Sequence, residues 1–175
     1  MRVFVLLALT LVWASCANPD PHHRLMSDNE MIDLFQRERA SFDSLATMLD
    51  EDADIGMLDS YARTFQSRGA DIHMMQIPEA RRAAYERLLR RVYCSRNIWS
   101  TDDGILMQQF VQKWQPNARD NWMRGFWYAR KPLGKGQITT ENLLGDRDET
   151  PDPSRIRYRH LSGAWYLYTD HGYNG

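Results

Sequence analysis

The sequence predicts an α+β fold in which two N-terminal helices pack on an antiparallel sheet formed mainly by the C-terminal half. Apolar residues recur every three or four positions over 28–50 and again after Pro78, as on amphipathic helices. From residue 98 onward the pattern changes to short apolar and aromatic runs bounded by Gly and polar residues, which is typical of strands. Hydrophobic residues make up 43% of the 175 residues, enough to build the core of one domain.

The first sixteen residues have the order of a bacterial export signal. Arg2 gives a positive start, and residues 3–12 form an apolar stretch that is too short to span a bilayer, which needs ~20 residues. Ala14 and Ser15 then precede Cys16, and this order resembles the lipobox of bacterial lipoproteins, although Trp13 stands where that motif usually has Leu. The resemblance implies a signal peptide over 1–15 and a diacylglycerol on the thiol of Cys16.

The residue after the cysteine bears on location. By the same resemblance, Ala17 rather than Asp after Cys16 implies the outer membrane, with the protein facing the periplasm. The alternative is ordinary secretory cleavage after Ala17, which would give a soluble periplasmic or secreted protein. Residues 16–26 are predicted to be a tether because Pro19 and Pro21 interrupt regular structure, which leaves 27–175 as the single domain.

The first helix is predicted over 28–50. Ser27 and Glu30 have the spacing of a capping box, in which each side chain accepts a hydrogen bond from the other residue's backbone amide. Glu38 falls on the apolar side of this helix. A carboxylate there is either a catalytic or ligand-binding group or, as we favour, the partner of an arginine from the sheet.

An acidic turn is predicted after this helix. Asp50, Asp52 and Asp54 imitate the first half of a calcium loop, but Ile55 and Tyr61 stand where that loop requires Gly and Glu. We therefore expect an acidic turn rather than a metal site, with weak Ca²⁺ binding as the alternative, and a reversal of the chain at Gly56. Residues 57–69 suit a strand or a short helix, and we favour a strand because Tyr61, Arg63 and Phe65 alternate with polar or small neighbours.

The second helix is predicted to start at Pro78, because proline is tolerated in the first helical turn. Tyr85 and Leu89 belong to its apolar stripe. The arginines around the stripe would suit a membrane surface, but Glu79, Glu86 and the shortness of the stripe favour the solvated face of a packed helix. Cys94 follows this helix, and we expect it to be a buried structural thiol.

Two aromatic strands are predicted at 125–130 and 163–169. In the first, Trp127 points to the opposite face from Phe126, and in the second Trp165 points to the opposite face from Tyr166. Because both faces carry large side chains, we expect one face to pack on the helices and the other to be partly covered or to line a groove. The polar stretch 132–154 between the strands is predicted to be a long loop.

Three arginines alternate before the last strand. Arg155, Arg157 and Arg159 share one face and are the candidate ligand-binding residues, because a row of guanidiniums binds anions such as a lipid headgroup or a partner's carboxylates. The alternative, which we favour, is an exposed strand that its charge protects from edge-to-edge pairing.

No convergent catalytic set is evident in the sequence. Glu38, His160 and His171 are weak acid or base candidates, and His171 is expected in a polar tail. Gly134-Lys135-Gly136 lacks the further residues of a phosphate-binding loop, so no cofactor is predicted.

The whole layout resembles small envelope lipoproteins of Gram-negative bacteria, through the lipobox, the long helix with its acidic turn, the Arg-rich helix and the closing aromatic strand. The resemblance implies a place in the envelope and no particular reaction. We expect a non-enzymatic module, held in the membrane through the lipid on Cys16, that binds an envelope protein or an anionic ligand. A net charge of −1 argues against nucleic acid. The alternative is a periplasmic hydrolase acting on glycan or lipid.

Overall fold

The computed structural model describes residues 26–59, 62–69, 71–94, 97–109, 121–134, 138, 143 and 156–172, with the side chains at 121, 122, 171 and 172 left undescribed. Within these residues it contains three helices and seven strands. In chain order they are α1 (Asp28–Arg37), α2 (Arg39–Glu51), β1 (Ile55–Leu58), β2 (Phe65–Ser67), α3 (Glu79–Arg91), β3 (Ile98–Ser100), β4 (Gly104–Gln109), β5 (Asn121–Ala129), β6 (Arg157–Ser162) and β7 (Trp165–Gly172).

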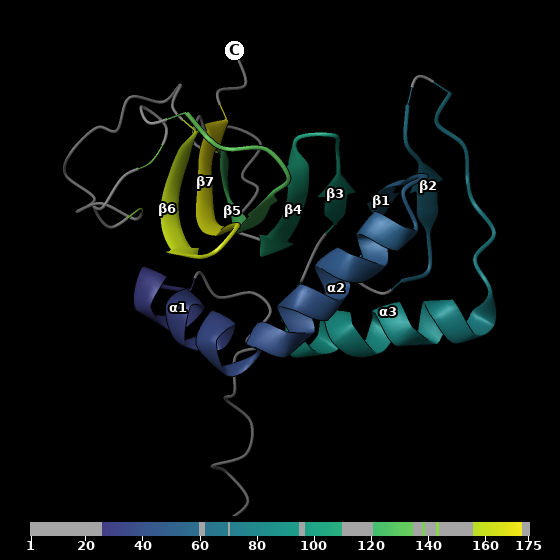
Figure 1. Ribbon diagram of the computed structural model, residues 1–175, viewed down its shortest axis with the longest axis horizontal. Coiled ribbons are helices and arrows are strands. Elements are labelled where there is room, and N and C mark those ends of the chain that lie inside the picture. The colour runs from purple at the N-terminus through teal and green to yellow at the C-terminus, as the bar shows by residue number, and fades with distance from the viewer. Residues whose placement is uncertain are drawn as a thin grey trace, which may run out of the picture.

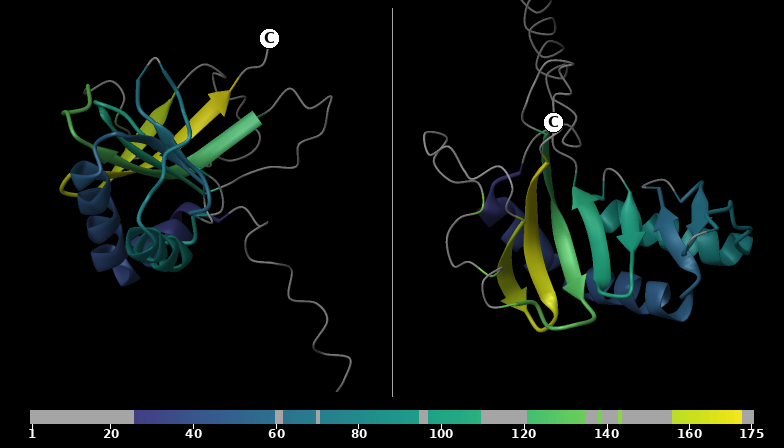
Figure 2. Two further views of the ribbon diagram at one scale, coloured as in Figure 1. Left: turned by 90° about the vertical axis from the view of Figure 1, so that its right-hand side faces the viewer. Right: turned by 90° about the horizontal axis from the view of Figure 1, so that it is seen from above.

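The seven strands form one antiparallel sheet in the order β2-β1-β3-β4-β5-β7-β6. The three helices lie along one face of this sheet (Figure 1), and the view from above shows the other face with no described helix in front of it (Figure 2). The predicted α+β class is confirmed, with five of the seven strands in the C-terminal half.

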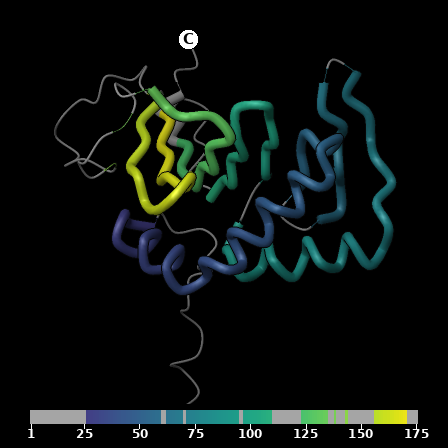
Figure 3. Tube along the Cα trace, in the orientation of Figure 1, coloured from purple at the N-terminus to yellow at the C-terminus, as the bar shows by residue number. Residues whose placement is uncertain are grey.

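The helix expected over 28–50 is present as two helices that meet at Glu38. The capping box at its start is confirmed, since the amide of Glu30 lies 3.3 Å from Ser27 Oγ and the amide of Ser27 lies 2.8 Å from Glu30 Oε2. At Glu38 the backbone leaves helical geometry, with φ −105° and ψ 19°, and α1 and α2 run in different directions (Figure 3). This break changes how the helices meet the sheet.

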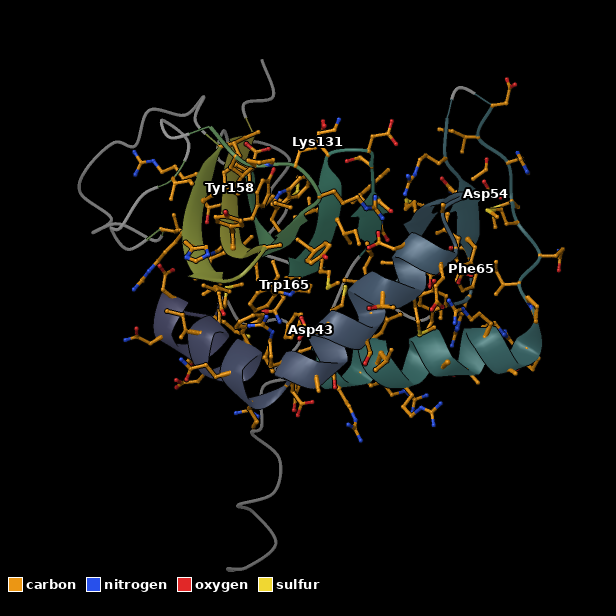
Figure 4. The ribbon with its side chains drawn as sticks, viewed as in Figure 1. Asp43, Asp54, Phe65, Lys131, Tyr158 and Trp165 are labelled. Atoms are coloured by element: carbon orange, nitrogen blue, oxygen red, sulfur yellow. The ribbon has the colours of Figure 1, made fainter. Side chains whose placement is uncertain are left out.

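Four aromatic rings form the centre of the core. Phe35 from α1 and Phe42 from α2 both contact Phe126 of β5 and Trp165 of β7, with ring centroids 4.6 to 6.1 Å apart. The break between the helices allows a side chain from each of them to reach the same two strands. Trp165 also donates from Nε1 to Asp43 of α2 at 2.8 Å, between the sheet and the helix layer (Figure 4). The predicted alternation in the aromatic strands is confirmed.

The acidic turn after α2 joins that helix to α3. Asp52 Oδ2 accepts from Tyr85 Oη at 2.6 Å and from Arg81 Nε at 2.7 Å. Arg81 also pairs with Glu51 at 2.8 Å. α3 begins after Pro78, as predicted. The turn is therefore an ion-pair junction between two helices.

Two predicted boundaries are wrong. Gly56 does not reverse the chain but lies inside β1, where an added Cβ would stand 2.8 Å from Ser67 O on β2. Residues 169–172 are not a polar tail, because they complete β7, and Thr169 is fully buried. The strand predicted over 57–69 is divided into β1 and β2.

Candidate functional site

A row of side chains crosses the whole sheet on the face that the helices leave uncovered. In sheet order its members are Gln66, Met57, Trp99, Leu106, Trp127, Tyr166 and His160, each the direct register partner of the next. We call these seven residues the transverse row. Directly paired residues lie on the same face of a sheet, and neighbouring strands are ~4.8 Å apart, so the row is about 30 Å long.

Much of the transverse row is accessible. Trp99 is 41% exposed, His160 is exposed, and Trp127 and Tyr166 are half-buried, whereas Leu106 is buried. At the end of the row, Gln66 also forms an isolated β-bridge with Met74, whose side chain is 56% exposed. The two aromatic strands alone predicted a face that is partly covered or lines a groove. The strand register extends this surface across all seven strands.

Two further aromatic side chains, on β6 and β7, lie beside the transverse row near Trp127 of β5. Tyr158 and Tyr168 are register partners whose rings lie 5.5 Å apart, and Trp127 lies 6.0 Å from Tyr158. Tyr168 donates to Asp170 at 3.2 Å. Burial, followed by the nearby charge of Asp170, raises the pKa of both tyrosines, so both are neutral at physiological pH.

The Trp127 ring lies close to the backbone of β4 at Gly104, which has no side chain. A Cβ at Gly104 would stand 2.5 Å from the Trp127 ring and 2.4 Å from Tyr128 O. The Trp127 Nε1 is buried, and within the described residues it has no hydrogen-bond partner. Unsatisfied buried donors are few in native proteins, and a bound water or ligand is one explanation for them.

The chemistry of the transverse row is that of flat apolar rings interspersed with hydrogen-bonding groups. Trp, Tyr and His each have an apolar ring body and a polar edge. None of the seven members has a carboxylate, guanidinium or ammonium group. Such a surface suits an elongated ligand without strong charge.

The predicted arginine row lies on the other side of the sheet. Arg157 and Arg159 pair in register with Thr169 and Leu167, which face the helices. Arg159 Nη1 lies 3.3 Å from Asp28 Oδ2, so this arginine contacts α1. Arg155 lies outside the described residues.

The three acid or base candidates are not brought together among the described residues. Glu38 lies between α1 and α2, and its partner is the Ser41 hydroxyl at 3.1 Å rather than the predicted arginine of the sheet. His160 lies on the helix-free face, with its ring 5.1 Å from Tyr166 and Nε2 3.0 Å from Gly163 O. His171 lies in β7, but its side chain is outside the described part.

Cys94 is buried, as expected, with Sγ 3.4 Å from Gln108 O. Cys16 and the residues predicted to form the signal peptide and most of the tether fall outside the described residues. Across the described ranges, no helix is long and apolar enough to cross a membrane. In the same part of the chain, no group of three or more metal-binding side chains is present.

Comparisons of the chain with protein-family models, with curated proteins and with solved structures found no match.

Proposed function

We propose that this chain is a lipid-anchored envelope protein, without enzymatic activity, that binds an elongated uncharged polysaccharide along the transverse row. The observation that carries the proposal is the unbroken register from Gln66 to His160 across all seven strands. The envelope location is supported by the order of residues 1–16, in which an apolar stretch precedes Ala14, Ser15 and Cys16.

The spacing of the row favours a β-linked sugar chain. The ~4.8 Å step from strand to strand is about the length of one pyranose unit in such a chain. A pyranose ring has C–H bonds on its two faces and hydroxyls around its edge. Its face therefore packs on an aromatic ring while its hydroxyls reach the polar edges of Tyr166, His160 and Gln66.

Other elongated ligands fit this surface less well. Extended peptides usually add to a sheet at an edge strand, whereas the transverse row runs across the face. Each edge of this sheet already has a bridge, from Met74 to Gln66 and from Ile138 to Tyr158. Anionic polymers are selected by guanidinium and ammonium groups, and the row has none.

The hydrolase alternative needs at least two of its acid or base candidates in one site. Glu38 belongs to the helix layer and His160 to the opposite face of the sheet, and no hydrogen bond joins them within the described residues. A binding role is therefore better supported than a hydrolytic one.

A calorimetric titration of the mature protein with a β-1,4-linked hexamer of N-acetylglucosamine tests the proposal. We expect saturable binding that Trp99→Ala weakens about tenfold, because stacking on one aromatic side chain is worth ~1–3 kcal/mol in the comparable case of nucleic-acid bases. Trp99 is 41% exposed, so its removal leaves the core intact.

Tyr93→Ala is the matched control, because Tyr93 is 43% exposed and lies outside the transverse row. We expect this variant to bind the hexamer as the wild type does. Absence of heat with the wild type, or equal weakening by the two substitutions, would contradict the proposed surface.

A further inference from the structure

A second row of polar side chains crosses β5, β7 and β6 on the face that meets the helices. Arg124, Thr169 and Arg157 are direct register partners on these strands, so their side chains lie next to one another. Arg124 is 1% exposed and Thr169 is 0% exposed, whereas Arg157 is half-buried on the edge strand. The row is deep at Arg124 and comes closer to solvent at Arg157.

Positive charge exceeds negative charge around this polar row. Asp28 is the first residue of α1, and its Oδ1 accepts a hydrogen bond from Arg124. Its Oδ2 lies 2.8 Å from the amide nitrogen of Leu143 and 3.3 Å from Arg159 Nη1. Both of its oxygens are therefore in use. In this row Asp28 compensates the charge of Arg124, and among the described residues no carboxylate pairs with Arg157, so one positive charge of the row is left over.

Two buried polar atoms of the row have no hydrogen-bond partner within the described part of the chain. They are Arg124 Nε and Thr169 Oγ1. Leaving such a group without a partner costs about 1–3 kcal/mol each, and an unseen ion or water is a recognised explanation. Burial lowers the pKa of Arg124, and the charge of Asp28 opposes this effect.

We infer that Arg124, Thr169 and Arg157 bind an oxyanion, the carboxylate or phosphate group of a small ligand. Arg124 Nε–H and the Thr169 hydroxyl donate to its oxygens from the buried end, and the Arg157 guanidinium donates from the edge of the sheet. An oxyanion meets both requirements of the site, because it accepts these hydrogen bonds and supplies the missing negative charge. The site lies on the opposite face from the transverse row and does not depend on the proposed polysaccharide.

Thermal unfolding of the mature protein tests this site. We compare sodium phosphate and sodium acetate with sodium chloride at equal ionic strength. At an anion concentration about tenfold above Kd, the midpoint is expected to rise by about 3–6 °C relative to chloride. A larger rise with phosphate identifies a phosphate ligand, and a larger rise with acetate identifies a carboxylate ligand.

Two variants separate this site from a general salt effect. Thr169→Val removes the hydroxyl at nearly constant shape, and Arg157→Gln removes the guanidinium at the edge. Each is expected to lose more than half of the anion-dependent rise. Arg90→Gln is the matched control, because it makes the same change of charge at an exposed residue of α3, and it should keep the full rise.

Because Arg157 is half-buried on an edge strand, Arg157→Gln remains informative if Thr169→Val fails to fold. The inference is overturned if neither anion raises the midpoint of the wild type above its value in chloride. It is also overturned if the folded variants retain the full rise.

Discussion

At the scale of single residues, the buried pair of Asp28 and Arg124 is the most consequential contact described. The two side chains are 4% and 1% exposed, and they join the start of α1 to the middle of β5. Arg124 also donates to the carbonyl of Met26, just before the helix. A buried ion pair adds little net stability compared with apolar side chains of the same size, but removing one partner leaves an uncompensated charge in the interior.

Asp28→Asn is therefore expected to lower the free energy of unfolding by about 3–5 kcal/mol, measured by urea unfolding. The double variant Asp28→Leu/Arg124→Met should recover part of this loss, because it removes both buried charges but leaves the amide of Leu143 without its acceptor. Glu86→Gln, which breaks the exposed pair with Arg90, should cost less than about 1 kcal/mol. An Asp28→Asn variant as stable as the wild type would show that the pair is not buried in solution.

At the scale of elements, α2 and α3 are held together through Asp52. The pKa of Tyr85 is raised above its ordinary value of 10.0, first because burial disfavours the phenolate and then because Asp52 accepts the hydroxyl's hydrogen bond. Above about pH 10 the unfolded chain therefore loses the Tyr85 proton while the folded chain keeps it. The folded state then binds more protons, so its stability falls as the pH rises.

This effect is expected to lower the free energy of unfolding by up to about 1.4 kcal/mol per pH unit above pH 10. Tyr85→Phe should remove this part of the alkaline loss, while costing about 1–3 kcal/mol near pH 8 through the lost hydrogen bond to Asp52. Urea unfolding of both proteins between pH 8 and 11 measures the two slopes. Parallel slopes would mean that Tyr85 ionises equally in the folded and unfolded states.

At the scale of the whole molecule, the two faces of the sheet have different roles. One face packs on three helices and includes the buried polar row, and the other presents the transverse row. If the chain is anchored through Cys16, residues 17–25 separate the lipid from the first described residue, Met26. The proposed anchor and the proposed binding surface therefore belong to separate parts of the chain.

The proposed anchor is tested by the intact mass of the protein extracted from bacterial membranes. We expect a chain that begins at Cys16 and includes the mass of the attached acyl groups. A Cys16→Ala variant should appear in the soluble fraction without added mass. An unmodified wild-type chain that begins at Asn18 would contradict the anchor and make the protein soluble after export.

The parts of the fold that depend on neighbouring residues were predictable from the sequence. The capping box of Ser27 and Glu30 and the start of α3 at Pro78 are local signals, and the alternation around Trp127 fixes which side chains share a face. The break at Glu38 was not predicted, because the apolar spacing continues through it, and the rings that Phe35 and Phe42 contact on either side, Phe126 and Trp165, lie far along the chain.

Both proposed binding sites also depend on distant contacts. The transverse row requires the register of seven strands, and it includes Met57 and Trp99 from strands of only four and three residues. Arg124 and Thr169 were not predicted, because nothing in their local sequence shows that they pair and are buried. The alternation of Arg157 and Arg159 was the one local signal for the oxyanion site.

The order of the strands has a consequence for how the chain folds. Four of the six neighbouring pairs join strands that are consecutive in the chain, so most of the sheet can assemble from hairpins. Short-range pairing of this kind favours rapid folding, since little loop entropy is lost before contacts form. The contact between Asp28 and Arg124 spans 96 residues, and we expect it to close among the last, when the first helix docks on a sheet that is already paired.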